Sequence, residues 1–381
     1  MYSIDRGTFR RPQDVLPEEV LRLFGEEKRS DSFSYGHEQG DKELRGMIAR
    51  GENQKHGTSY SEENIAMMPG AWAGLEFVLQ EIMDMKSSRS RDGCIIIVGP
   101  TLYQMFYGPI TFFGMDIRAY DFTKKEKIYT PEKEDIEGLF EHKPKVIVLT
   151  NPNNPNGIYT KNDVLKQIIE EAKKRDAYVI IDEMQNFLRE PELRYGSWIQ
   201  SPHVIRIDSP SKRYGMADQR VGWVIADKRM LGNRMEGIIG RMSSMMGNAP
   251  RSANTALKYI LKNEIEWRMG GDDMFAEVKK GLKEKEEYVC KRLGQMGRVK
   301  EIMKREGCIN QAVRLDGGKT DKEIAEKLME QGVLITPGSG YGYDPEDAVL
   351  RITFAERIKE KLKPALDIVE ATLSKMGDKT P

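Results

Sequence analysis

Three short apolar runs in the sequence are each followed by side chains that can bind charged groups or transfer protons. VIVLT is followed by NPNNPNG at residues 151–157, YVII by Asp182, and VIRID by SPSK, which ends at Lys212. Arg220 comes eight residues after that lysine. Because ligands collect at the carboxyl ends of parallel strands, we expect these side chains to converge on one rim of a sheet. Neither G-x-G-x-x-G after a strand nor a Walker A sequence occurs, which excludes the usual nicotinamide and P-loop sites.

The elements that would position these residues alternate between short apolar runs and amphipathic stretches. The runs are β-branched, and several are apolar on both faces, as in a buried parallel strand; they lie at 94–98, 146–149, 178–181, 204–207 and 221–225. Apolar residues recur at helical spacing over 164–172, and Thr160 with Asp163 predicts a capping box at the start of that helix. This alternation predicts an α/β fold, with a mostly parallel sheet flanked by helices.

The pattern changes near residue 265, where a charged helical stretch at 274–293 begins a region of a different kind. Short strands are expected at 309–315, 333–336 and 349–354, with helices at 321–331 and 356–375. We therefore predict three parts: an N-terminal segment (1–35) that packs with the small domain, a large domain (36–264) and a smaller α+β domain (265–381).

The composition excludes several classes of protein. The 381 residues contain 60 Lys+Arg and 60 Asp+Glu, a balance that argues against a nucleic-acid partner or a polybasic membrane surface. The three cysteines (Cys94, Cys290 and Cys308) are far apart, and no two of the four histidines are four residues apart, so neither a disulfide framework nor a metal site is expected. Without a signal peptide or an apolar run long enough for a membrane span, a cytoplasmic location is expected.

Taken in order, NPNNPNG, IIDE and SPSKRYGMADQRVGW resemble the fold-type I pyridoxal-phosphate enzymes, specifically the class I/II aminotransferase family. The resemblance covers nearly the whole chain. Its outer markers are Tyr35 with the G-x-x-x-LR stretch at 40–45, the Gly70-Ala71-Trp72 sequence, and LRITFA with Arg351.

The resemblance implies pyridoxal 5'-phosphate as cofactor and assigns the central residues. Lys212 would form the internal aldimine and act as general acid and base, and Asp182 would pair with the pyridine nitrogen. Asn154 would bind the ring 3-oxygen and border the substrate, while Ser209, Ser211 and Arg220 would bind the phosphate. The alternatives are a solvated loop lysine, a helix-capping aspartate and a plain Asn-Pro turn.

The outer markers also acquire roles from the resemblance. The backbone of Gly70, Ala71 and Trp72 would bind the phosphate at a helix start, unless it is an ordinary turn. Tyr103 would stack on the ring, although it lies one position later than usual and a core or surface tyrosine is equally compatible.

Arg351 would hold the substrate α-carboxylate, and the alternative is a structural salt bridge. Gly7 would line the same pocket, unless it belongs to a plain turn. Tyr35 would reach the phosphate of a partner subunit, which predicts a homodimer with shared active sites; the alternative is a core tyrosine at a helix start.

Two positions depart from the family pattern. Gln185 occupies the place of a tyrosine that bonds the 3-oxygen, and Pro69 replaces a phosphate-binding serine. An amide can donate a hydrogen bond but cannot titrate like a phenol.

The expected activity is transamination between an α-amino acid and a 2-oxo acid. The alternatives are another pyridoxal-phosphate reaction (a β- or γ-lyase, a decarboxylase or a cyclase) and a non-catalytic ligand sensor. The sequence does not define the substrate side chain, and Arg241 and Arg251 are more compatible with surface positions than with substrate binding.

Overall fold

The structure is a computed structural model that describes residues 2–4, 18, 35–86, 94–98, 116–120, 133–186, 194–271, 273–316 and 318–377. Gly7 and Tyr103 lie outside the described residues, as does most of the N-terminal segment 1–35.

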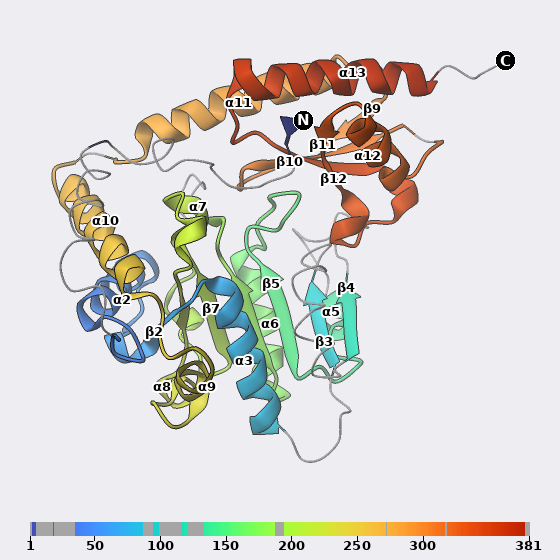
Figure 1. The fold of residues 1–381 in the computed structure, drawn as a ribbon. Helices are drawn as coiled ribbons and strands as arrows, with labels where there is room; N and C mark the ends of the chain where they lie inside the picture. Colours follow the sequence, from blue (N-terminus) through green and yellow to red (C-terminus); the bar gives the residue numbers. More distant parts are fainter. Residues whose placement is uncertain are drawn as a thin grey trace.

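A seven-stranded sheet forms the centre of the large domain (Figure 1). In spatial order its strands are β2 (Ile65–Met68), β8 (Gly222–Ile225), β7 (Val204–Asp208), β6 (Tyr178–Asp182), β5 (Val146–Thr150), β3 (Cys94–Val98) and β4 (Asp116–Tyr120). From β7 to β4 all neighbours are parallel, whereas β8 runs antiparallel to both β7 and β2. The five strands predicted from sequence are confirmed; β2 and β4 were not anticipated.

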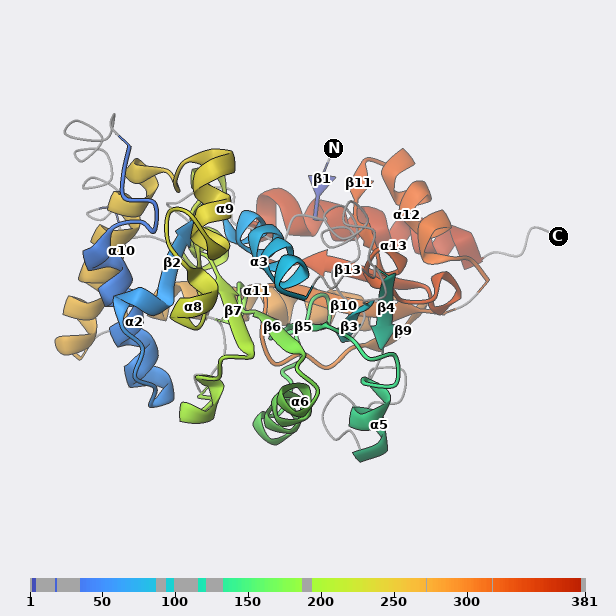
Figure 2. The same cartoon turned by 90° about the horizontal axis from the view of Figure 1, so that it is seen from below.

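Helices cover both faces of this sheet, and each face has its own apolar core. One core contains α3 (Ala71–Lys86) and α9 (Gly237–Met246), and the other contains α6 (Asn162–Lys174) and α5 (Lys133–Gly138); Figure 2 shows the two layers on opposite sides. Since side chains alternate along a strand, Ile180 enters the first core and Ile181 the second. The same alternation directs Asp182 and Glu183, at the end of β6, to opposite faces.

The predicted capping box before α6 is wrong. The N-cap is Lys161, which makes no side-chain capping bond. Thr160 instead donates its backbone N–H to Oδ1 of Asn151 at 3.0 Å, so this residue belongs to the turn after β5 rather than to the helix.

The small domain contains an antiparallel four-stranded sheet and the final helices. In spatial order the strands are β12 (Thr336–Pro337), β13 (Val349–Thr353), β10 (Asn310–Leu315) and β9 (Val299–Ile302). The helices α11 (Ala276–Gly294), α12 (Asp321–Glu330) and α13 (Lys363–Gly377) pack on it, and α13 follows a π-helical turn at Ile358–Leu362. The helix α10 (Arg251–Met269) runs across the domain boundary that was expected at residues 264 and 265.

The first residues of the chain lie against this small domain. The strand β1 (Tyr2–Ser3) pairs in parallel with β11 (Val333–Leu334), and the Thr353 N–H donates to the Ile4 carbonyl at 2.9 Å. The remaining elements of the large domain are α2 (Lys42–His56), α7 (Pro210–Arg213) and α8 (Lys228–Leu231), with short 3₁₀ turns between them. No helix in the described part of the chain combines the length and apolar composition that a membrane span requires.

Candidate active site

Lys212 lies in the one-turn helix α7, directly after β7. Ser209 is the N-cap, and its Oγ accepts the Ser211 N–H at 3.3 Å, while Pro210 at the first helical position favours the turn. Burial, and next the cation of Arg351, lower the pKa of Lys212 to about 8, against the opposing carboxylate of Asp182. The amine therefore feels both an acidic and a basic side chain and loses its proton more readily than an ordinary lysine.

Asp182 is buried at the carboxyl end of β6, with 9% of its surface exposed. Its Oδ1 accepts the Met184 N–H at 3.0 Å. Burial, with a smaller contribution from Glu183, raises the pKa of this carboxyl to about 6, although the Met184 N–H and Lys212 act in the opposite direction. A buried carboxylate with so little pairing can gain considerably from a cationic ligand.

The start of α3 forms a cradle in which a side chain at either of two glycines would clash. Gly70 has a φ of 91°, and a Cβ there would lie 2.6 Å from Nη2 of Arg220. A Cβ on Gly222 would lie 2.7 Å from the backbone nitrogen of Ala71. The first N–H groups of α3 have no partner within the helix, so they and the Arg220 guanidinium form a place suited to an anion such as phosphate. Trp72 is 36% exposed at this helix start.

The two serines before Lys212 are both buried. Ser209 uses an oxygen lone pair to cap α7, and its hydroxyl proton can still be donated to an anion. Ser209 therefore caps a helix, whereas the Asp182 carboxyl accepts the N–H of Met184 in a turn.

Asn154 and Arg351 connect the two domains at the site. Arg351, on β13, is 8% exposed, and its Nη1 lies 3.4 Å from Oδ1 of Asn154. Its Nη2 donates to Oγ1 of Thr336 at 3.2 Å, and the guanidinium lies 4.9 Å from the ring centre of Tyr341. Asn310 Nδ2 also lies 3.4 Å from Asn154 Oδ1. These contacts orient a guanidinium toward the turn that carries Asn154.

Sequence reasoning missed Asn310, Thr336 and Tyr341. Asn310 could have been noticed as a polar residue within an apolar strand. Thr336 and Tyr341 had no comparable signal, since they reach Arg351 only through the pairing of β12 with β13 and the turn that follows β12.

Gln185 is buried in the turn after β6, and its Oε1 has no hydrogen-bond partner among the residues that the structure describes. Within the described ranges, the Oδ1 of Asn153, in the turn after β5, is likewise buried without a partner. Buried amide oxygens without a donor are costly, so both atoms indicate a site that is completed by a polar ligand.

Three further residues considered in the sequence analysis, Tyr35, Arg241 and Arg251, have the following positions. Tyr35 is 90% exposed and its ring lies over Gly247, so within this protomer it is not the core tyrosine of the alternative interpretation. Arg241 forms ion pairs with Glu81 at 2.8 Å and Asp84 at 2.5 Å, which accounts for it as a structural residue. Arg251 begins α10.

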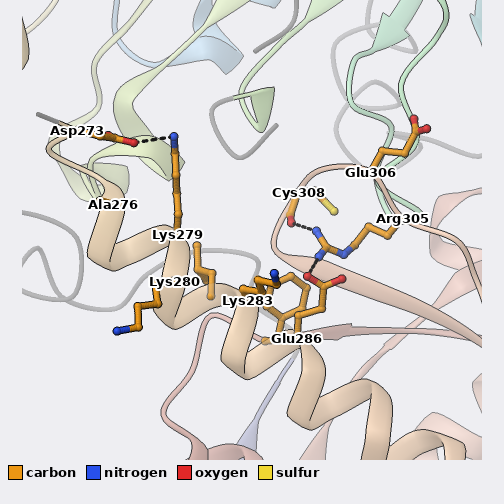
Figure 3. A pocket seen from close by; sticks show the side chains of 11 residues that line it. Asp273, Ala276, Lys279, Lys280, Lys283, Glu286, Arg305, Glu306 and Cys308 are labelled. Atoms are coloured by element: carbon orange, nitrogen blue, oxygen red, sulfur yellow. Dashed lines mark hydrogen bonds and ion pairs between the residues drawn. The ribbon is translucent and has the colours of Figure 1, made fainter. Parts of the chain in front are cut away.

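A cavity of about 590 Å³ lies at the start of α11, in the small domain (Figure 3). Lys279 pairs with Asp273 at 2.9 Å, and Arg305 pairs with Glu286. The lining residues include none of the predicted site residues; they are Asp273, Ala276, Lys279, Lys280, Leu282, Lys283, Glu286, Arg305, Glu306, Cys308 and Phe354. Among the described residues, no group of His, Cys, Asp or Glu is arranged to hold a metal ion.

The donor set fits a phosphorylated pyridine aldehyde. The anion cradle at Gly70 and Arg220 suits the phosphate, Asp182 suits a protonated ring nitrogen, and the lowered pKa of Lys212 suits attachment to an aldehyde. The unpartnered amide oxygen of Gln185 lies in the turn that follows Asp182. The fold and this set of side chains are those expected of a fold-type I pyridoxal-phosphate enzyme.

Comparison with known proteins identifies the family. The model of aminotransferase class I and II matches residues 3–369, and the chain therefore belongs to this family, as predicted. It is 25% identical to aspartate aminotransferase of Thermotoga maritima over 96% of this chain and 89% of the relative. It is 24% identical to asparagine–oxo-acid transaminase of Streptococcus mutans over 96% of this chain and 90% of the relative.

Solved structures confirm the fold. The chain superimposes on aspartate aminotransferase of Thermus thermophilus with maleate at a TM-score of 0.82 and 19% identity, covering 98% of this chain and 91% of the other. Aromatic aminotransferase of Pyrococcus horikoshii gives a TM-score of 0.83 at 21% identity, with coverage of 98% and 96%. Family membership implies pyridoxal 5'-phosphate as the cofactor.

Proposed function

We propose that this aminotransferase moves an amino group between an α-amino acid and a 2-oxo acid, with Lys212 as the catalytic residue. The observation that carries the proposal is the position of the Lys212 amine, where Asp182 and Arg351 both act on its charge and its pKa falls to about 8. Such an amine is neutral often enough near neutral pH to attack an aldehyde and to accept a proton.

The cofactor would supply an aldehyde for attachment and a ring that withdraws electrons from the substrate α-carbon. Asp182 would hold the ring nitrogen in its protonated form, and Gln185 and Asn154 would bond the ring oxygen. Arg220, Ser209, Ser211 and the N–H groups of α3 would bind the phosphate.

Nζ of Lys212 would then take the proton from the substrate α-carbon and return it one position away, on the cofactor. Keeping both positions within reach of one amine makes the transfer direct, and general acid–base catalysis of this kind contributes about 10²–10⁴-fold.

Arg351 would bind the substrate carboxylate through its planar fork, next to Asn154. Its burial and its contacts with Thr336 and Tyr341 fix the orientation of the guanidinium. This role restricts substrates to acids that carry an α-carboxylate. The names of similar proteins include aspartate, asparagine, alanine and aromatic substrates, so the side chain is a matter for measurement.

A spectroscopic screen tests the proposal. The purified holoenzyme is mixed with each amino acid, and conversion of the cofactor absorbance to the pyridoxamine form is expected with the true substrate. A 2-oxo acid should then restore the original spectrum. Release of ammonia without any need for a 2-oxo acid would instead indicate a lyase.

We further propose a homodimer in which Tyr35 reaches the phosphate site of the partner subunit. The support is its 90% exposure within one protomer, which an aromatic side chain rarely retains in an assembled site. Mixing Tyr35→Phe with Lys212→Ala tests this, because one site of each mixed dimer would carry both changes and the other neither. Recovery of activity on mixing is expected, and a fully active monomer in sedimentation would contradict the dimer.

A further inference from the structure

A buried cluster of charged and aromatic side chains lies behind Asp182, on the opposite face of the central sheet. At its centre is Arg206 of β7, which is 2% exposed. Its Nε donates to Oε2 of Glu183 at 2.8 Å, and its Nη1 donates to Oε2 of Glu52, on α2, at 2.5 Å. Two carboxylates therefore share one guanidinium, and the cation of Lys55 also acts on Glu52.

The cluster is joined to the active site through two routes. Glu183 directly follows Asp182, and its Oε1 accepts the Tyr195 hydroxyl proton at 2.6 Å. The Tyr195 oxygen in turn accepts Nδ2 of Asn151 at 3.1 Å, and the Asn151 N–H donates to the Asp182 carbonyl at 2.8 Å. Asn151 also begins the turn that carries Asn154, so one chain of hydrogen bonds holds both parts of the site.

The other members of the cluster complete its packing. His56 stacks on Tyr195 with the ring centres 4.8 Å apart, and its Nδ1 accepts the Tyr195 N–H at 3.1 Å. Because Nδ1 accepts a hydrogen bond, the neutral ring would carry its own proton on Nε2, which lies 3.3 Å from Glu52 and 3.2 Å from Nη2 of Arg206. Burial, above all, lowers the pKa of His56, which favours the neutral form of this histidine.

We propose that Arg206 is a positioning residue for Asp182. From the rear face of the sheet, Arg206 holds Glu183 and, through Tyr195, Asn151. Its positive charge also offsets the charge of Glu183, the neighbour of Asp182. The inference rests on the proposed function, because it assumes that Asp182 binds the cofactor ring. It adds a set of residues that touch neither cofactor nor substrate.

The charges around both groups determine the expected direction of change. Asp182 faces Glu183 from its own chain and Lys212 from α7, and Lys212 in turn faces Arg351 from β13. Arg206 faces two tyrosines as well as the two carboxylates. Glu183 also faces Asp208, which faces Arg213. The titratable and charged side chains around the cluster are Glu52, Lys55, His56, Tyr60, Glu183, Tyr195, Asp208 and Arg213. Loss of the Arg206 charge should favour the protonated form of Asp182, and loss of the Glu183 charge should favour the ionised form.

The test measures the dissociation constant of pyridoxal phosphate from the full-length apo-protein at a series of pH values around 6, where Asp182 titrates. Arg206→Gln should move the acid limb of this curve to higher pH by at least about half a unit, which weakens binding about threefold within the limb. Glu183→Gln should move the limb to lower pH. Arg292→Gln, which removes an arginine paired with Asp367 and Glu370 in the small domain, is the matched control and should leave the limb in place.

Two further variants separate charge from position. Tyr195→Phe removes the hydroxyl that joins Glu183 to Asn151 without changing any charge, and should weaken cofactor binding with the limb unmoved. Arg206→Lys keeps the charge but loses the fork, and should behave in the same way.

Movement of both acid limbs in the same direction, or by no more than in Arg292→Gln, would overturn the inference. If Arg206 and Glu183 were merely structural, Arg206→Gln and Glu183→Gln would both lower the stability of the protein, and their acid limbs would not move in opposite directions. If Arg206→Gln does not fold, Glu183→Gln and Tyr195→Phe decide the question. The inference is then supported only if Glu183→Gln moves the acid limb to lower pH and Tyr195→Phe weakens cofactor binding without moving the limb. Absence of cofactor binding to the unchanged protein would instead refute the proposed function.

Discussion

Asp182 and Glu183 are adjacent in sequence, yet the two faces of the sheet treat their carboxylates differently. Behind the sheet, Glu183 contacts the Arg206 guanidinium at 2.7 Å and the Tyr195 hydroxyl at 2.6 Å. In front of the sheet, Asp182 accepts one backbone N–H and has a pKa raised to about 6. Full pairing stabilises a buried charge, whereas incomplete pairing leaves free energy that a ligand can recover.

Two cations in one segment of the chain, Arg206 and Lys212, differ in the same way. Against the burial that lowers it, Glu183 and Glu52 raise the pKa of Arg206, so this charge is permanent. Six residues later, burial and Arg351 lower the pKa of Lys212 to about 8. The rear face therefore has a fixed structural charge and the front face has an amine that can lose its proton.

The largest expected effect comes from removing Lys212, the amine of the front face that can lose its proton. Lys212→Ala should lower turnover by about 10²–10⁴-fold, because the variant lacks the amine proposed to move the α-proton. Cofactor should still bind through the phosphate cradle, and this can be measured by absorbance. In the unchanged protein, borohydride reduction and peptide mapping should find the pyridoxyl group on Lys212; a label on another lysine would refute the site.

The next effect concerns Arg351, the cation that small-domain strand β13 brings to the front face. Arg351→Ala should cost about 2–5 kcal/mol of binding, seen as a raised KM for the amino acid and the 2-oxo acid alike. Arg351→Lys should restore only part, since an ammonium lacks the fork. Arg314→Ala, on the neighbouring strand β10 and paired with Glu301, is the control and should leave both constants unchanged. Normal kinetics in Arg351→Ala would make the residue structural.

The comparison of the two carboxylates predicts opposite changes in stability. The folded pKa of Asp182 is above its ordinary value of 3.8, so stability from this group is lost as pH rises from about 4 to about 6. Asp182→Asn avoids that loss and should raise the free energy of unfolding of the apo-protein near pH 7 by at most about 3 kcal/mol. Glu183→Gln should lower it, because Arg206 loses a partner. Thermal unfolding of the two apo-variants checks this, and destabilisation by Asp182→Asn would contradict it.

The fold and much of the front face were predictable from sequence because they depend on local patterns. Short β-branched runs gave five strands of the central sheet, and the polar residues after them gave Asn154, Asp182 and Lys212. The strand β2 was missed because it is the antiparallel edge strand, and its apolar residues resemble the start of a helical stripe. Thr160 misled the capping prediction because a nearby acceptor, Asn151, competes for its N–H.

The rear cluster was not predictable from sequence. Glu52 and Tyr195 lie about 140 residues apart in the chain, and both contact Arg206 because the fold brings α2 to this cluster. An arginine inside an apolar strand, such as Arg206 in VIRID, was the one available signal that a buried charge needs partners. Their identities depend on tertiary packing, which no periodicity encodes.

The smallest expected effect tests what lowers the pKa of Lys212. With a pKa of about 8, roughly a tenth of Lys212 is neutral at pH 7, and the rate of cofactor attachment to the apo-protein should rise with pH through that value. Arg351→Gln removes the cation that is the second cause of the lowered pKa, so the midpoint should move upward. Attachment near pH 7 should then slow by less than about tenfold, and the two rates should converge at high pH. Stopped-flow absorbance after mixing with pyridoxal phosphate measures this, with Arg314→Gln as the matched control. A midpoint that stays unchanged in Arg351→Gln would mean that burial alone sets the pKa of Lys212, and that Arg351 acts on the substrate without acting on the lysine.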